Sequence, residues 1–227
     1  TDFSDAELVA ADFESARLDG TNLARTRFRR TSFEGLDLSA VRIERTSFVE
    51  CDLTGVRLSG RDLSGCEFAD AILDGADLTG ANLSRAVARG CDFGSAKLRG
   101  ATLAGLHAPT ADFSRADLSE ATFREADLSQ SQFEETAALK TDFSGSRLEQ
   151  TVWVKADLRG STFAGAKLAH ADFSYAHIEN ADFSMADLTL ADVHAAPDAG
   201  AKWDGAVLKN LRRTDADRLA GENWKEA

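Results

Sequence analysis

An apolar side chain recurs at every fifth residue along almost the whole of this chain of 227 residues. Of the 42 positions in this phase between residues 3 and 208, 38 hold Leu, Phe, Ile, Val or Trp, and no insertion shifts the phase. All 14 phenylalanines fall in it, and the exceptions are Ala88, Ala108, Ala138 and Asp198. We call these positions anchors. Any fold of the chain must bury them at a period of five.

A period of five fits neither a continuous helix nor a long straight strand. On an α-helix successive anchors would lie about 140° apart and wind around the axis. On a straight strand an odd spacing would send every second anchor to the opposite face. All anchors point inward only if the chain turns a corner after each pentapeptide, so that four pentapeptides close a square coil of about 20 residues.

Two further residue preferences share this period. The residue two before each anchor lies on the same face of a short strand, and this inner position is mostly Ala, Thr, Ser or Cys, with departures such as Leu36, Arg61 and Leu106. The residue two after each anchor, which we call the corner position, holds 15 of the 17 glycines. Glycine adopts a positive φ at the least cost, so a tight turn is expected at each corner.

The pentapeptides resemble a known repeat. Segments 76–80 (ADLTG), 81–85 (ANLSR) and 126–130 (ADLSQ) are similar to the A-(D/N)-L-x-x motif of the pentapeptide repeat protein family, and the resemblance covers nearly all of residues 1–210. It implies an all-β fold, a right-handed quadrilateral β-helix of about 10 coils of 20 residues, stacked at about 4.8 Å. We expect residues 211–227 to form a C-terminal cap segment.

The two ends of the expected rod differ. After Leu208 the phase stops, and Thr214 followed by residues 215–220 predicts a capped short helix. The apolar residues available there to cover the last coil are Leu211, Leu219 and Trp224. The N-terminal end begins in phase without a capping segment. We therefore expect an upstream domain of a longer protein, or end-to-end pairing of two rods, to cover it.

Residues 20 apart should stack, which makes the packing predictable column by column. Ala88 and Ala108 are neighbours in one anchor column, so we expect a thinner or locally loosened core there. Pro197 and Asp198 predict an irregular corner. One surface column should form an ion ladder that helps to fix the register, at about 0 to 1 kcal/mol per exposed pair. It comprises Arg17, Asp37, Arg57, Asp77, Lys97 and Asp117.

The sequence contains no catalytic or cofactor-binding motif. A phosphate-binding glycine loop, a dinucleotide fingerprint, H-E-x-x-H and G-x-S-x-G are all absent. Cys51, Cys66 and Cys91 occupy the inner position, where packing explains them. The four histidines fall in different columns or phases, which argues against a shared metal site. We therefore predict a protein that is not an enzyme and has no metal or cofactor.

Charge points to a protein partner. With 26 Lys and Arg against 38 Asp and Glu, the formal net charge is −12, which excludes an ordinary basic nucleic-acid binder. No apolar run approaches the length of a membrane span. Arginines make the N-terminal end locally basic, whereas no Lys or Arg occurs from residue 169 to residue 201. We predict an acidic partner-binding surface toward the C-terminal end of the rod, formed by Asp172, Asp182, Asp187 and Asp192. Asp172 and Asp192 belong to a column that also contains Asp12, Asp52, Asp92 and Asp112.

Two function classes follow from these features. The first is a non-catalytic protein-binding scaffold or spacer. The family resemblance implies that such a domain is part of a larger bacterial protein, including ones associated with secretion systems and effectors, and we expect a bacterial cytoplasmic location. The alternative is an acidic rod that mimics DNA, because the family includes members that bind a type II topoisomerase and protect gyrase from quinolones. The arginines near the N-terminal end and the lack of a loop insertion argue against this alternative.

Overall fold

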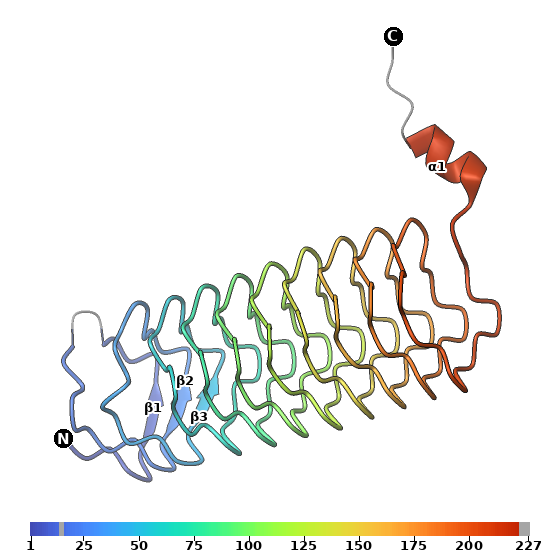
Figure 1. Ribbon diagram of the computed structural model, residues 1–227. Coiled ribbons are helices and arrows are strands. Elements are labelled where there is room, and N and C mark those ends of the chain that lie inside the picture. Colours follow the sequence, from blue (N-terminus) through green and yellow to red (C-terminus); the bar gives the residue numbers. More distant parts are fainter. Residues whose placement is uncertain (14–15, 223–227) are drawn as a thin grey trace.

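The chain forms a rod of stacked square coils that runs from the N-terminal to the C-terminal end (Figure 1). The computed structural model describes residues 1–13 and 16–222. Three parallel strands, β1 (Glu7–Val9), β2 (Arg27–Arg29) and β3 (Ser47–Val49), pair in the order β1-β2-β3. Further along the rod, isolated parallel bridges join residues 20 apart, as between Asp77 and Lys97. The predicted coil of four pentapeptides is therefore confirmed.

Neighbouring coils and the turn together satisfy the backbone N–H groups of a pentapeptide such as the one around Leu78. In residues 77–81, Asp77 N–H donates to Val56 O at 2.9 Å in the preceding coil. Leu78 and Gly80 N–H donate to the following coil, and Ala81 N–H closes the turn on Leu78 O at 2.9 Å. The remaining donor, Thr79 N–H, is taken by the Asp77 carboxylate at 3.1 Å. An Asp or Asn before the anchor is therefore first of all a part of the turn.

The corners adopt the left-handed backbone that the glycines predict. Every described corner residue from 5 to 210 except Ala40 has a positive φ, for example 64° at Gly80 and 56° at Arg85. A residue with a Cβ pays about 1 to 2 kcal/mol there. Ala40 is next to Val41, which lies one coil before Arg61, and Arg61 is the single arginine of the sequence at an inner position. Arg61 donates to the carbonyls of Ser39 and Val41, the residues that flank Ala40.

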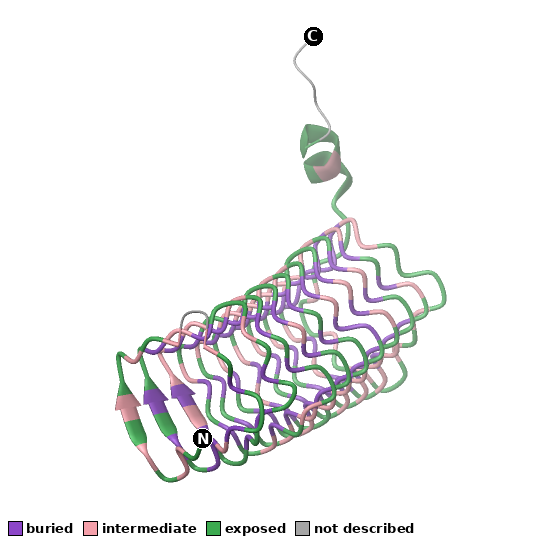
Figure 2. Cartoon of the chain, turned by 90° about the vertical axis from the view of Figure 1, so that its left-hand side faces the viewer, coloured by how far each residue is buried: buried purple, intermediate pink, exposed green. Residues whose placement is uncertain are grey.

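We number the four sides of the rod by their anchors. Side 1 begins with Phe3 and Leu23, side 2 with Leu8 and Phe28, side 3 with Phe13 and Phe33, and side 4 with Leu18 and Leu38. Anchors and inner residues fill the interior, and the outward positions face solvent (Figure 2).

Aromatic anchors stack along the sides. On side 3, Phe93, Phe113, Phe133 and Trp153 have successive ring-centroid distances of 4.8, 5.0 and 3.9 Å. Trp153 Nε1–H donates to Thr151 Oγ1 at 2.8 Å, so this buried indole has a partner.

The core is regular at Ala88 and Ala108, so the expectation of local loosening is wrong. Both side chains are fully buried, and their N–H groups keep ladder bonds of 2.7 and 2.8 Å. Before Ala108 the inner position holds the larger Leu106, which is also fully buried, whereas before Ala88 it holds the buried Ala86.

The expected irregular corner at Pro197 is wrong, because Ile178 N–H still donates to Pro197 O at 3.1 Å and Ala201 N–H closes the turn on Asp198 O at 2.9 Å. Within the described residues, the difference is that no bridge joins His177 to Pro197. Proline has no N–H to donate there.

The C-terminal helix α1 (Ala216–Glu222) is present, but its cap and its packing differ from the prediction. Asp215 rather than Thr214 caps it, because Asp215 Oδ1 accepts the N–H groups of Asp217 and Arg218 at 2.9 and 3.0 Å. Leu211 packs against the core as expected. The described residues of α1 include no buried side chain, and the helix lies outside the coils at the C-terminal end of the rod (Figure 1). Trp224 lies outside the described residues.

Candidate partner-binding surfaces

The four aspartates predicted to bind a partner do not share a face. Asp172 and Asp192 are stacked on side 3, whereas Asp182 lies on side 1 and Asp187 on side 2. Their positions are 10 and 5 residues apart, so consecutive pentapeptides carry them around the rod rather than along it. An acidic stretch of sequence is thus distributed over three sides of the rod. Binding of a partner by any of the four stays a prediction.

Much of their charge is already engaged. Each of the four accepts the N–H two residues ahead, at 2.8 to 3.0 Å. Hydrogen bonds from Ser184 and Thr189 lower the pKa values of Asp182 and Asp187. Asp182 also lies 3.7 Å from Lys202 Nζ. Asp192 is nearly buried, at 4% exposure, and pairs with two arginines. Only Asp172 and Asp187 lack an ion pair within the described residues.

A longer run of unpaired carboxylates lies on side 3 nearer the N-terminal end. The five pentapeptides of this side from 31–35 to 111–115 contain five acids and one basic residue, the corner residue Arg115. None of the five forms an ion pair within the part of the chain that the structure describes. We call this set the side-3 stripe, and it comprises Glu34, Asp52, Asp74, Asp92 and Asp112.

The carboxylates of the stripe lie close together. A Cβ at Gly94 would lie 3.0 Å from Asp92 Oδ1 and 3.1 Å from Asp74 Oδ1, so acids from neighbouring coils meet over this glycine. Asp92 and Asp112 are directly paired in the ladder, at about one strand spacing of 4.8 Å. The aspartate column in the sequence indicated this surface. The sequence-based prediction nevertheless placed the partner surface at Asp172 to Asp192, because it compared charges along the chain and not along each side of the rod.

The remaining surface charges are more evenly matched. At the N-terminal end, Arg25 pairs with Asp5, and Arg29 and Arg30 both pair with Glu50 at 2.6 Å. The residues of the predicted ion ladder from Asp37 to Asp117 stack as expected. Of these described residues, Arg57 and Asp37 form an ion pair at 3.1 Å, and the other neighbours in the ladder form none. Hydrogen bonds from Ser39, together with Arg57, lower the pKa of Asp37 to about 2.

The comparisons with known proteins agree with this architecture. The pentapeptide repeat region family matches residues 106–183, and the family of pentapeptide repeats in eight copies matches residues 6–45, 51–87 and 62–105. The chain belongs to the pentapeptide repeat family. A comparison with curated protein sequences finds no significant match.

Solved pentapeptide repeat structures share the right-handed quadrilateral β-helix. HetL, involved in heterocyst differentiation regulation in the cyanobacterium Nostoc sp. strain PCC 7120, is 25% identical with a TM-score of 0.58, over 93% of this chain and 86% of HetL. A trypsin-treated variant of QnrB1, a plasmid-mediated fluoroquinolone resistance protein, is 25% identical with a TM-score of 0.55, over 87% of this chain and 91% of that one. Full-length QnrB1 is 20% identical with a TM-score of 0.50, over 94% and 93%, a likeness of fold alone.

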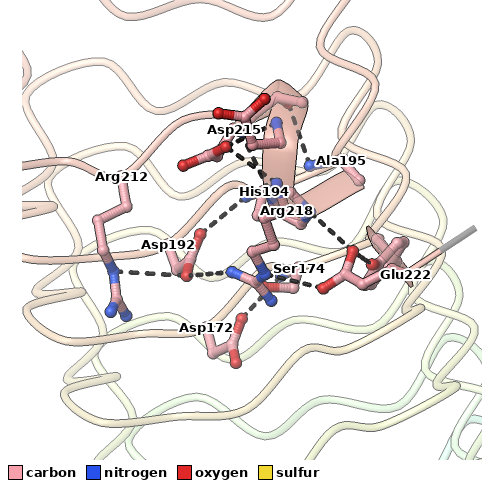
Figure 3. A network of polar contacts seen from close by, with 12 residues as sticks. Asp172, Ser174, Asp192, His194, Ala195, Arg212, Asp215, Arg218 and Glu222 are labelled. Atoms are coloured by element: carbon pink, nitrogen blue, oxygen red, sulfur yellow. Dashed lines mark hydrogen bonds and ion pairs between the residues drawn. The ribbon is translucent and has the colours of Figure 1, made fainter. Parts of the chain in front are cut away.

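In this pentapeptide repeat protein, α1 is attached to the C-terminal end of side 3 by polar contacts (Figure 3). His194, which is buried, accepts the Asp215 N–H at Nδ1, at 3.3 Å. Its proton therefore lies on Nε2, which is 3.0 Å from Glu222 Oε2. Arg218 joins the helix to the coil by contacting Asp192 Oδ2 at 3.3 Å. This network, rather than apolar burial, holds the helix.

Glu222 is the centre of that network. Its carboxylate accepts from the Tyr175 hydroxyl, from His194, and from Arg218 Nε at 2.8 Å. The hydrogen bonds from Tyr175 and Arg218 lower the pKa of Glu222 to about 2. The hydrogen bond between Tyr175 and Glu222 also raises the pKa of the Tyr175 hydroxyl. Sequence reasoning missed this site because its residues are 28 and 47 positions from Glu222.

The cysteines are packing residues. All three are free and buried, and burial raises the pKa values of Cys51 and Cys66 to about 11. A thiol with a raised pKa is a poor nucleophile at neutral pH. Within residues 1–13 and 16–222, no group of three or more His, Cys, Asp or Glu is placed to hold a metal ion. The same residues include no helix with the length and apolar character needed to cross a membrane.

Proposed function

We propose that this pentapeptide repeat protein is a non-catalytic scaffold that binds a basic surface of a protein partner through the side-3 stripe. The observation that carries the proposal is five acids in successive coils on that side, with Arg115 as the single basic residue of their pentapeptides. The ladder bonds hold these positions in a fixed, flat array, so a partner meets a pre-organised surface. Complementary charge of this kind favours fast and specific association.

Charge density favours this scaffold over a mimic of duplex DNA. DNA carries one negative charge per about 1.7 Å of its axis. The stripe offers one carboxylate per coil, or one per about 4.8 Å. This is about a third of the DNA value. Topoisomerase binding by DNA mimicry is therefore the second candidate, supported by the similarity to QnrB1, a fluoroquinolone resistance protein.

The test removes the charge of the stripe without disturbing its turns. The variant carries Glu34→Gln, Asp52→Asn, Asp74→Asn, Asp92→Asn and Asp112→Asn. Asparagine can still accept the turn N–H, as Asn82 does at 3.0 Å. A matched control removes five charges from side 4 by Asp37→Asn, Asp77→Asn, Asp117→Asn, Asp157→Asn and Glu120→Gln.

Both variants and the wild type are used to capture proteins from bacterial lysate, with quantification by mass spectrometry. We expect one or more basic partners to fall at least tenfold with the side-3 variant and less than twofold with the side-4 control. Equal capture by all three proteins, or equal loss with both variants, would contradict the proposal. A parallel supercoiling assay with purified type II topoisomerase and a quinolone tests the second candidate. Protection that the side-3 variant loses would move topoisomerase binding to first place.

A further inference from the structure

The corner between sides 1 and 2 carries a column of charges that begins with a complete ion pair. Arg25 contacts Asp5 twice, with Nε to Oδ1 at 2.7 Å and Nη2 to Oδ2 at 2.6 Å. These residues are 20 positions apart, in neighbouring coils. An acid and an arginine one coil apart on this corner can therefore form a bidentate contact.

The next two arginines of the column have no such acid. Continuing from Arg25, the column holds Arg45, Gly65, Arg85 and Gly105. Arg45 thus lies between an arginine and a glycine, and Arg85 between two glycines. Within the described residues, neither guanidinium forms an ion pair or a hydrogen bond. Both corners have a positive φ, which holds the two side chains on the outside of the rod.

The two arginines line one pocket. It is lined by Arg45, Ser64, Gly65, Ser84, Arg85 and Ala104. A Cβ at Gly65 would meet nothing within 4 Å, so the floor of this pocket is open at the level where an acid would complete the column. We call this pocket the arginine notch.

The acids nearest in sequence are committed elsewhere. Glu44 pairs with Arg42 at 3.0 Å. The Asp62 Oδ1 atom accepts from Ser64 N–H and from Asn82 Nδ2, and a Glu67 oxygen accepts from Ser47 Oγ at 2.9 Å. The guanidinium donors of the notch therefore remain available to an external anion.

We propose that the arginine notch binds a single phosphate group, seated over Gly65 between Arg45 and Arg85. The two arginine corners are two coils apart, about 9.5 Å, so an anion midway is one coil from each, as Asp5 is from Arg25. A phosphate presents oxygens in tetrahedral directions and can accept from a planar guanidinium on both sides, whereas a carboxylate has two oxygens in one plane. The group can come from free phosphate or from a phosphorylated side chain of a protein. The notch lies at the corner between sides 1 and 2 and shares no residue with the side-3 stripe, so this inference goes beyond the proposed scaffold surface.

The experiment titrates the full chain with inorganic phosphate and, separately, with a short phosphoserine peptide, and follows the arginine Nε–H signals by NMR. The test variant is Arg45→Gln with Arg85→Gln, and the matched control is Arg115→Gln. Arg115 is also a corner arginine, with φ 61° and no ion pair among the described residues, but it does not line the arginine notch. A second test places an acid in the column itself by Gly65→Asp, with Gly65→Asn as its neutral counterpart. Asp and Asn both occur at corners with positive φ, at Asp5 and Asn180.

We expect saturable phosphate binding that weakens at least tenfold in the double variant and less than twofold in Arg115→Gln. Gly65→Asp should weaken binding at least fivefold more than Gly65→Asn, because its carboxylate takes the place of the phosphate. Tighter binding of the phosphoserine peptide identifies a phosphorylated protein as the source, and equal binding identifies the free ion. Binding that does not saturate, or that is equal in the double variant and in Arg115→Gln, would overturn the proposal.

Discussion

Phe143→Ala tests the central claim that the anchors of successive coils form one continuous core. The Phe143 side chain is fully buried. It stacks on Phe123 and Phe163 with ring centroids 5.0 Å away on both sides. It also meets Phe133 and Trp153 edge to face, at 6.2 and 5.2 Å.

The expected loss of stability follows from these contacts. Replacing a buried Phe by Ala costs about 3 to 5 kcal/mol through lost transfer free energy and a residual cavity. Each aromatic pair contributes about 0.5 to 1.5 kcal/mol beyond its buried area, and Phe143 belongs to four of them. The ladder bonds of the coil limit its collapse into the cavity. We therefore expect a loss at the upper end of the range, about 4 to 5 kcal/mol in the free energy of unfolding.

Equilibrium unfolding in urea, followed by circular dichroism and by tryptophan fluorescence, measures this loss. Met185→Ala is the control, because Met185 is 70% exposed at a corner. We expect the control to change the free energy of unfolding by less than about 0.5 kcal/mol. A loss below about 1 kcal/mol for Phe143→Ala would refute the inward placement of the anchors and the continuity of the core.

Three further predictions concern the turns and α1. Asp77→Ala should cost about 1 kcal/mol of stability, whereas Asp77→Asn should cost less than half of that, because asparagine can still accept the Thr79 N–H. Urea unfolding distinguishes the two, and equal losses would contradict the role of the carboxylate in the turn. Asp215→Ala should destabilise α1 by about 1 kcal/mol through loss of its N-cap, seen as faster amide exchange at Leu219 with no change at core amides such as Leu78. Protection of Leu219 that survives the substitution would rule out the cap. The docking of α1 should weaken as the pH falls from about 4.5 toward 2, because the pKa of Glu222 is lowered from 4.5 to about 2 and the carboxylate favours docking only while ionised. NMR shifts of the Tyr175 ring measure this release, and Glu222→Gln should remove the step. A step that persists in Glu222→Gln would assign it to another group.

The sequence predicted the interior well because the anchor and inner positions depend on local geometry. Phe143 and Leu78 are buried where the period places them. The exception at Ala88 and Ala108 is instructive. The period identified these two small anchors, but it carried no information on whether the buried side chains around them, such as Leu106, keep the coil regular. Packing volume is shared between side chains of different positions, so a single column cannot predict it.

The surface was predicted less well. The acidic stretch from Asp172 to Asp192 is contiguous in sequence, yet successive pentapeptides turn each acid onto another side. Asp192 is then neutralised by Arg212 and Arg218, from the last coil and from α1. The side-3 stripe arises in the opposite way, because acids about 20 residues apart in sequence become neighbours in space.

The sequence by itself determined the coil, because almost every pentapeptide contains the anchor, an inner residue that is mostly small and the corner residue that turns the chain, and many add an Asp or Asn that accepts the turn N–H. A fixed period of five also fixes every neighbour at a separation of 20, so local and long-range order coincide. Only the tertiary structure decided where α1 lies and which charges remain unpaired. Those outcomes depend on long side chains such as Arg218 and Glu222, which reach residues far from them in sequence. Their contacts are set by the three-dimensional positions of the coils and not by any repeating pattern.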